Sequence, residues 1–592
     1  MDEKKKVLDE SSTNDQEKWV HDSSLDYKGR IPLRASTGSW KAAFFIIATE
    51  FSERLSYFGL AANLIIYLTR VLHQDLKTAA KSVNYWSGVT TMMPLLGGFL
   101  ADAYFGRFST VLASSIVYLL GLLLLTMSRV IPGLEPCGPG TKTCNEPRRV
   151  HEVIFFFAMY LISIGTGGHK PALESFGADQ FDDDHSVERQ KKMSFFNWWC
   201  FGLCCGLLFG VTVIVYIQDH VGWAPADIVL TLVMSFTVLI FCVGRPFYRF
   251  RKPMGSPLTP MVQVIVAAFV KRNLQSPSDP DLLYEVSDSD KTRSSTRLLF
   301  HTKKFMFLDK AAILEDRFRQ DPWRLATVTR VEEVKLILNM IPIWLTTLPF
   351  GICVAQTNTF FIKQSTTLNR KITNSFTIPP ASVSALTAIS LIVSVAIYDK
   401  ILVPTLRRIT RNERGINILV RIGIGMIFSV LTMVVAALVE RKRLSIVEKD
   451  PLHSSLSMSV FWLAPQFIII AIGDCFTLVG LQEYFYDQVP DSMRSLGIAL
   501  YLSVIGASNF LSSVLIILVD RLTEKSGRSW FGKDLNSSRL DYFYWLLGSI
   551  TAVNIFVYAF VARKYSYKNV VRNTNVAVAD CYLGSNGMKT MA

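Results

Sequence analysis

Long runs of apolar residues, separated by shorter polar and charged segments, extend from residue 40 to residue 562. A helix needs about 20 apolar residues to cross the roughly 30 Å hydrocarbon layer of a membrane. The first half of the chain predicts six such helices, at residues 40–69, 79–101, 109–131, 153–176, 195–217 and 228–243. The second half predicts six more, at residues 334–361, 381–403, 416–439, 460–484, 496–519 and 543–562. We therefore expect an all-α membrane protein with twelve spanning helices.

A polar, charge-rich stretch at residues 249–330 separates the two sets of apolar runs. Within it, the apolar residues of 258–272 recur at helical spacing, which predicts an amphipathic helix at the membrane surface. The many lysines and arginines of this stretch, and those of residues 400–414, indicate the cytosolic side by the positive-inside rule. We therefore expect two six-helix halves joined by a long cytosolic linker.

The two ends of the chain are polar. Residues 1–38 contain no apolar core of a signal peptide, and we predict that they form a mobile cytosolic tail. The predicted organisation is this tail at 1–38, a first bundle at 39–248, the linker at 249–330, a second bundle at 331–563 and a cytosolic tail at 564–592.

Three charged residues, Glu50, Glu53 and Arg54, lie inside the first apolar run. On a helix they share one face. Each charge near the middle of a bilayer costs at least about 2.5–3.5 kcal/mol, so such residues normally face a bundle interior or a water-filled cavity. Arg54 alone could neutralise one glutamate as a packing lock, but the second acid is then left to take up a proton. We interpret the glutamates as proton carriers and Arg54 as their switch partner.

Composition and charge support a membrane protein and argue against a nucleic-acid partner. Half of the 592 residues are hydrophobic, and the mean hydropathy is +0.30, far from a soluble average. The net charge is +14, but the basic residues lie in tails and loops rather than in one patch interleaved with aromatics. This distribution is typical of loop charges that set membrane topology.

Several sequence motifs of enzymes and pumps are absent. The chain has no phosphate-binding loop, no His-Glu-x-x-His or Gly-x-Ser-x-Gly motif, and no metal-ligand spacing among its eight histidines. We therefore expect no enzymatic activity, no metal and no cofactor. An ion gradient is the remaining energy source, since one proton that enters down a membrane potential supplies ~2.3 kcal/mol per 100 mV.

Five sequence segments together carry a family resemblance. Residues 98–107 (GFLADAYFGR) resemble the loop signature of the major facilitator superfamily, in which Asp102 and Arg107 can make charge contacts that break and re-form as a conformational gate. The other segments are the Glu50-x-x-Glu53-Arg54 motif, which precedes residues 98–107, and GTGGHKP, FGADQF and FFNWW, which come after them. With these, the chain resembles the proton-coupled oligopeptide transporter family, and most of all its plant nitrate and peptide branch. The resemblance implies the twelve-helix major facilitator fold and proton symport.

The candidate substrate site combines residues of several spans. Lys170 in the fourth span requires an acid or an anionic substrate as partner, unless it extends to the membrane interface. Glu483 ends an apolar run, corresponds to the tenth-helix acid of the family, and could pair with Lys170; the alternative is an interfacial acid. Tyr57, Asn197 and Gln356 are candidate hydrogen-bonding groups around the substrate, although such residues are as often packing residues.

The function that these observations predict is symport of a small solute with protons by alternating access. Nitrate, a di- or tripeptide, and a plant hormone or specialised metabolite all remain open as substrates. Some nitrate-carrying relatives have a histidine where this chain has Val354, which weakens the nitrate alternative. A passive channel or uniporter and a transporter-like receptor are the alternative functions. We expect a monomer in the plasma membrane or the vacuolar membrane, with the solute, protons and the lipid bilayer as its partners.

Three modification sites are predicted. Arg107-Phe108-Ser109-Thr110 resembles a basophilic kinase site, so Thr110 is a candidate for phosphorylation by a regulatory kinase. Asn536 begins an Asn-Ser-Ser sequon in the last outer loop, which predicts glycosylation. Cys137 and Cys144 lie in a Gly/Pro-rich loop expected on the oxidising side, where a disulfide and a free pair are equally open.

Overall fold

The computed structural model describes residues 18–567 with several gaps. The residues left out within this range are 21, 23, 135, 137–147, 183–184, 254, 257, 275–282, 286–298, 300, 315–320, 375, 411–415, 450–457, 490–493, 526–528, 533 and 566. Cys137 and Cys144, the predicted disulfide pair, lie outside the described residues.

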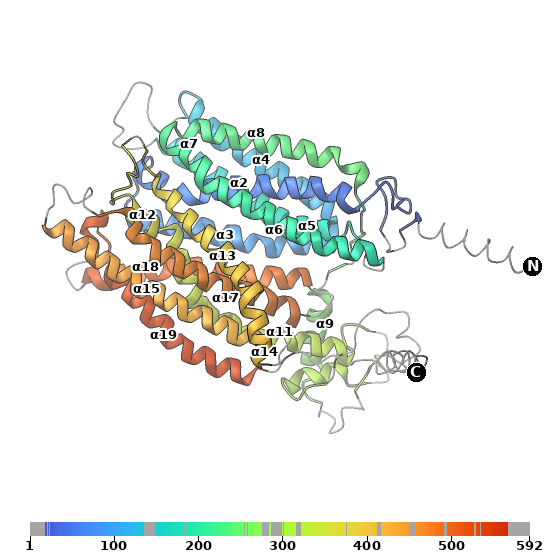
Figure 1. Cartoon of the computed structure of the whole chain (residues 1–592). Helices are drawn as coiled ribbons and strands as arrows, with labels where there is room; N and C mark the ends of the chain where they lie inside the picture. Colours follow the sequence, from blue (N-terminus) through green and yellow to red (C-terminus); the bar gives the residue numbers. More distant parts are fainter. Residues whose placement is uncertain are drawn as a thin grey trace, which may run out of the picture. The chain divides into compact units, whose positions relative to one another are not determined.

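Each predicted span of the first half coincides with a helix or a run of helices, which lie side by side in Figure 1. They are α2 (Ser39–Arg70), α3 (Leu76–Leu100), α4 (Arg107–Val130), α5 (Arg149–Ala178), α6 (Ser186–Phe209) with η2 (Gly210–Ile214) and α7 (Val215–His220), and α8 (Trp223–Val243). A short π-helical turn, η1 (Ala101–Phe105), continues α3.

The second half follows the same pattern, with the helices interrupted more often. Its helices are α11 (Val328–Ala355) with η7 (Gln356–Asn358) and α12 (Phe360–Ser365); η8 (Pro380–Ser384) with α13 (Ala385–Ile397), η9 (Tyr398–Leu402) and α14 (Val403–Thr410); α15 (Ile418–Lys449); η10 (Val460–Leu463) with α17 (Ala464–Gln488); α18 (Arg494–Lys525); and α19 (Leu540–Lys564). In the part of the chain that the structure describes, ten helical segments are long and apolar enough to cross a membrane. The two predicted spans not among them are α2, which carries the buried charges, and α3, which is rich in polar and small residues.

The chain divides into two compact units. The larger one contains Met1–Gly255, Ile343–Phe485 and Ser495–Arg563, and the smaller one Ser256–Pro342, Tyr486–Arg494 and Lys564–Ala592. In the smaller unit, the predicted amphipathic helix is present as α9 (Leu258–Val270) and packs on η5 (Met306–Ala312). The buried Lys335 ammonium lies 2.6 Å from Asp309 Oδ1 and 2.7 Å from Glu332 Oε1, which anchors η5 to the first turns of α11.

Glycines allow α5 to lie unusually close to α3 and α4. A Cβ atom added to Gly97 of α3 would collide with the backbone of Gly167 in α5, and one added to Gly165 would collide with the backbone of Tyr118 in α4. Small residues at such contacts let membrane helices approach backbone to backbone. This packing fixes the register of α5, and therefore the positions of the polar residues that follow the glycines.

The described residues in the range 18–38 form backbone and side-chain contacts with each other and with the chain after α8, and a cytosolic tail over this range stays a prediction. The backbone of this segment pairs with itself at Trp19 and Leu33, and Leu25 pairs with Phe250 after α8. Arg249, which has no exposed surface, donates to Glu188 Oε2 at 2.7 Å and to the carbonyl of Thr37 at 2.9 Å. Polar residues of this segment, such as Arg34, pair with the buried carboxylates of Asp182 and Glu188. The sequence pattern does not show that these carboxylates are near.

Replacing Arg249 should release this segment. We expect Arg249→Ala to lower the free energy of unfolding by ~3–5 kcal/mol, because Glu188 is then left buried without its main partner. Arg251→Ala is the matched control: Arg251 is more exposed and pairs with Asp22 at 3.0 Å, so its loss should cost only ~0–1 kcal/mol. Denaturation in detergent micelles measures both, and proteolysis after residue 18 reports release of the segment. Equal losses in the two variants would contradict the anchoring role of Arg249.

Candidate functional site

The centre of the candidate site is a buried ion cluster on α2. Glu50, Glu53 and Arg54 are each at most 2% exposed. Arg54 Nε lies 3.2 Å from Glu50 Oε1, and Arg54 Nη2 contacts the carboxylate of Glu53. One guanidinium therefore serves two carboxylates, and Glu50 Oε2 has no hydrogen-bond partner among the described residues. The structure brings these three predicted residues together.

Helix α5 supplies the second wall of this cluster. Thr166 Oγ1 donates to Glu53 Oε1 at 3.4 Å. The ring of His169 is fully buried, and a ring nitrogen lies within 4.8 Å of carboxylate oxygens of Glu50 and Glu53. Nothing in the spacing of the histidines indicates this grouping. Because Arg54 already pairs with both carboxylates, the arrangement suits an ion pair that can gain a proton better than a metal ion.

Aromatic residues surround the guanidinium. The ring centroid of Tyr57 lies 5.4 Å from Arg54 Cζ, and the same ring stacks on Trp86 with centroids 5.7 Å apart. A cation over an aromatic face is stabilised by ~0.5–2 kcal/mol. Tyr57 therefore helps to hold Arg54 in place.

Lys170 and Glu174 extend the charged cluster along α5. They are four residues apart, so they lie on one face of the helix, and both are half-buried. Lys170 is repelled by the charge of Arg54 and attracted by those of Glu50, Glu53 and Glu174, but it forms no ion pair with any described residue. Tyr501 of α18 lies near Glu174 and Arg54, so the second half of the chain also contributes to this site.

Glu483 does not pair with Lys170 in this structure, and a pairing of the two in a closed site stays a prediction. Its carboxylate lies 3.3 Å from Arg421 of α15, and its side chain is 34% exposed. Arg421 also donates to the carbonyl of Cys475 at 3.0 Å and lies over the ring of Tyr398 at 4.0 Å. Arg421 therefore pairs with Glu483 in place of Lys170. The sequence pattern did not indicate that Arg421 lies beside Glu483.

Asp474 is a buried acid that the sequence analysis missed. It lies on α17 nine residues before Glu483, is 7% exposed, and its Oδ1 has no hydrogen-bond partner among the described residues. The signal was present, because Asp474 is the single charged residue between Ala464 and Leu481. A buried carboxyl group without a partner is costly, and such groups are typical of functional sites in membrane proteins.

Gln356 contributes to a contact between the two halves. It is fully buried, and its Nε2 donates to the carbonyl of Ile352 at 2.8 Å and to Ser512 Oγ at 3.3 Å. The same Ser512 accepts a hydrogen bond from Asn84 of α3 at 3.1 Å. The side chain of Asn197, the remaining predicted substrate residue, is outside the described part of the structure, although α6 includes its backbone.

One further ion pair and one further hydrogen bond join the two halves. They lie at the helix ends that are expected on the outer side by the positive-inside rule. Lys77 Nζ of α3 lies 2.9 Å from Asp520 Oδ2 of α18, and Lys363 Nζ of α12 donates to Thr69 Oγ1 of α2 at 2.9 Å. Together with the Asn84–Ser512 hydrogen bond, these contacts hold the halves together at this end.

The predicted gate residues Asp102 and Arg107 are in contact at the opposite end. Arg107 Nε lies 3.0 Å from Asp102 Oδ1, and Arg107 Nη1 lies 2.5 Å from Asp179 Oδ2. Burial raises the pKa of Asp179 above its ordinary value, and the charges of Arg107 and Arg251 oppose this shift. Arg107 thus connects the turn after α3 with the end of α5.

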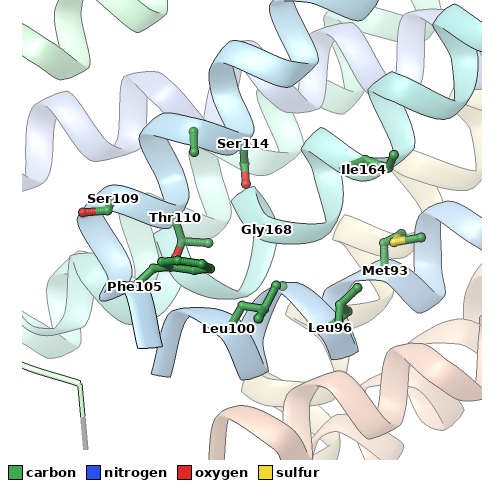
Figure 2. Close-up of a pocket in the computed structure, with 11 residues that line it drawn as sticks. Met93, Leu96, Leu100, Phe105, Ser109, Thr110, Ser114, Ile164 and Gly168 are labelled. Carbon is green, nitrogen blue, oxygen red and sulfur yellow. The ribbon is translucent and has the colours of Figure 1, made fainter. Parts of the chain in front are cut away.

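Thr110 lines an apolar pocket of about 330 Å³ between α3, α4 and α5, shown in Figure 2. Its hydroxyl donates to the carbonyl of Gly106 at 2.9 Å, and the residue is 8% exposed, whereas Ser109 beside it is exposed. Phosphorylation of Thr110 therefore remains a prediction that requires the first turn of α4 to move. Asn536 is exposed, its Oδ1 accepts from Arg443 Nη1 at 2.6 Å, and its glycosylation also remains a prediction.

The fold and the site define a helical multi-pass membrane protein that keeps an ionisable cluster in its interior. Comparisons with known proteins identify its family. The model of the PTR2 (POT family) proteins matches residues 108–533. The chain is 64% identical over 563 residues to the Arabidopsis thaliana protein NRT1/PTR FAMILY 5.6, which covers 94% of this chain and 96% of that protein. It is 60% identical to NRT1/PTR FAMILY 5.7 of the same plant, over 95% of this chain and 94% of that protein.

Solved structures agree with this assignment at the level of the fold. An auto-inhibited POT family peptide transporter matches with a TM-score of 0.68 at 19% identity, over 90% of this chain and 98% of that one. The POT family transporter PepTSo matches with a TM-score of 0.67 at 18% identity, over 88% and 98% of the two chains. The chain belongs to the POT family of membrane transporters and to its plant branch. The predicted resemblance, the fold class and the expectation of a transporter rather than an enzyme are confirmed.

A charge at position 110 should destabilise the apolar pocket. We expect Thr110→Asp to lower the free energy of unfolding by ~1–3 kcal/mol, because a carboxylate enters an apolar environment without a partner. Ser109→Asp should change it by less than about 0.5 kcal/mol, because Ser109, which also borders the pocket, is exposed, and the first turn of a helix tolerates a negative charge. Thermal unfolding in detergent distinguishes the two. A Thr110→Asp protein as stable as the parent would show that the pocket opens readily to a charged group.

Proposed function

We propose that this chain is a symporter that couples the inward movement of protons to the transport of a small solute. The observation that carries the proposal is the sharing of Arg54 between Glu50 and Glu53 in a fully buried position. Two adjacent carboxylates with one cation retain a surplus negative charge, and uptake of one proton removes it. Protonation of either glutamate also leaves Arg54 with a single partner, so the ion pairs rearrange.

The solute is expected to bind beside this cluster, near Lys170 of the first half and Tyr501 of the second. Tyr501 supports this location because it lies near Arg54 on α2 and Glu174 on α5. A solute held between two halves is released to either side when the halves rock. In the proposed cycle the contacts of Lys77 with Asp520 and of Asn84 with Ser512 break to open the outer side, and the Arg107 contacts act as the opposite gate.

The proposal leaves the membrane as either the plasma membrane or the vacuolar membrane, with the chain acting as a monomer. Nitrate, small peptides, plant hormones and specialised metabolites are the solute classes to be compared. A panel of these solutes in oocytes, at two external pH values, identifies the one that accumulates.

Removing one acid from the cluster should uncouple transport from the proton gradient. We expect Glu53→Gln to abolish accumulation of the solute against its gradient, because Arg54 then has one fixed partner and no proton-dependent exchange. Counterflow of labelled solute, which needs no net proton movement, should persist within about a factor of three of the parent rate. Proteoliposomes with an imposed pH gradient provide both measurements.

Glu152→Gln is the matched control, because Glu152 lies in the first turn of α5, away from the cluster, where it accepts from Gln74 at 3.3 Å. It should accumulate solute as the parent does. If Glu53→Gln also concentrates solute as well as the parent, the proton role is wrong. If flux never depends on the pH gradient in any of these proteins, the chain is a passive channel or uniporter.

Asp474 and Glu483 should differ in their effect on transport. We expect Asp474→Asn to lower the uptake rate at least about tenfold, because a buried unpaired carboxyl is available to a proton or to the solute. The same change should leave thermal stability equal or higher, because the amide costs less to bury than the acid. Glu483→Gln should lower uptake less than about threefold, since Glu483 is partly exposed and paired with Arg421. If Glu483→Gln lowers uptake more than Asp474→Asn does, Glu483 rather than Asp474 is the functional acid of α17.

A further inference from the structure

Glu174 gives the charged cluster a surplus of negative charge. We define this cluster as Glu50, Glu53, Arg54, Lys170 and Glu174. It contains three carboxylates and two cations, so its formal charge is −1 when all members are ionised. A single bound proton on the α2 glutamates therefore neutralises the cluster without leaving any positive charge for an anion.

The two cations of the cluster are not equally available to a solute. Arg54 is buried and its guanidinium contacts both α2 glutamates. Lys170 is half-buried and is the remaining cation, but it faces Glu174 one turn further along α5. An anion without a positive group would have to compete with that carboxylate for the ammonium of Lys170.

Glu174 itself is available. It is half-buried rather than enclosed, and it forms no hydrogen bond or ion pair with any described residue, although Lys170 lies at the i,i+4 distance that would permit one. Its electrostatic interactions reach Arg54 on α2 and Tyr501 on α18. A second, independent sign that the cluster awaits a partner is Glu50 Oε2, which is buried and has no hydrogen-bond partner among the described residues.

We propose that the solute carries a protonated amine and that the carboxylate of Glu174 recognises this group. This inference rests on the transport function proposed above and names the class of its solute. While the α2 glutamates carry no proton, an ammonium group beside Glu174 offsets the surplus charge of the cluster, and the phenol of Tyr501 can accept one of its remaining hydrogen bonds. A carboxylate elsewhere in the solute can meet Lys170. The cluster therefore ranks cationic amines first, zwitterions second and bare anions last.

Three probes with one scaffold test this ranking: alanyl-alanine amide with charge +1, alanyl-alanine with charge 0, and N-acetyl-alanyl-alanine with charge −1. Nitrate is the fourth probe. We expect the purified full-length protein to bind the amide at least about tenfold more tightly than the acetylated dipeptide or nitrate. Thermal shift in detergent, followed by titration calorimetry, gives these affinities. Tighter binding of either anion, equal binding of all probes, or no binding of any would overturn the proposal.

Glu174→Gln should reduce the preference for the amide over the acetylated dipeptide to within about threefold, because the amide side chain no longer carries the charge that selects ammonium. Glu152→Gln, on the same helix, should keep the full preference. A Glu174→Gln protein that melts as the parent does but retains the full preference would overturn the role of this residue.

These outcomes are separate from failure of symport. Binding in detergent needs no proton gradient, so a charge-selective protein that never concentrates solute in proteoliposomes would support the amine class and refute proton coupling. A protein that concentrates nitrate against its gradient would support proton coupling and refute the amine class.

Discussion

The sharing of one buried guanidinium by two carboxylates is the interaction on which the rest of the structure depends. Removing Glu50, Glu53 and Arg54 from water costs several kcal/mol per ion, and this cost is offset only if their geometry is held closely. The stacked pair of Tyr57 and Trp86 holds the arginine from one side. The cluster is therefore tolerated in the membrane because the surrounding helices fix it, and it is responsive because its charges do not balance.

The glycines of α5 make this fixation possible. Backbone contact between α5 and α3 at Gly97 and Gly167 leaves no room for side chains on that face, so the polar residues that follow must point elsewhere. Thr166, between Gly165 and Gly167, reaches Glu53, and Lys170 and Glu174 lie further along the same helix. Helix packing and charge placement are thus one constraint, since a shift of α5 by a single residue would remove the charged side chains from α2.

Hydropathy located the spanning helices because burial in lipid imposes one rule on every residue of a span. No such rule decides which buried charged residues pair with one another. Glu483 and Asp474 look alike in the sequence as acids of one helix, and only the position of Arg421 on a different helix distinguishes the paired acid from the unpaired one. The same reason explains the segment of residues 18–38, whose composition does not show that Arg249, beyond α8, donates a buried hydrogen bond to the carbonyl of Thr37.

The position of the contacts between the halves connects charge balance to conformational change. Lys77–Asp520 and Lys363–Thr69 lie at one end, and each is an interaction between partly exposed groups that is worth little by itself. Such contacts can be lost and regained at small cost, whereas the α2 cluster cannot move into lipid without exposing its ions. Rocking of the halves is therefore expected to break the weak contacts at the ends and preserve the strong ones at the centre. A change in charge at the centre, through one proton or one ammonium group, can then bias which end is closed.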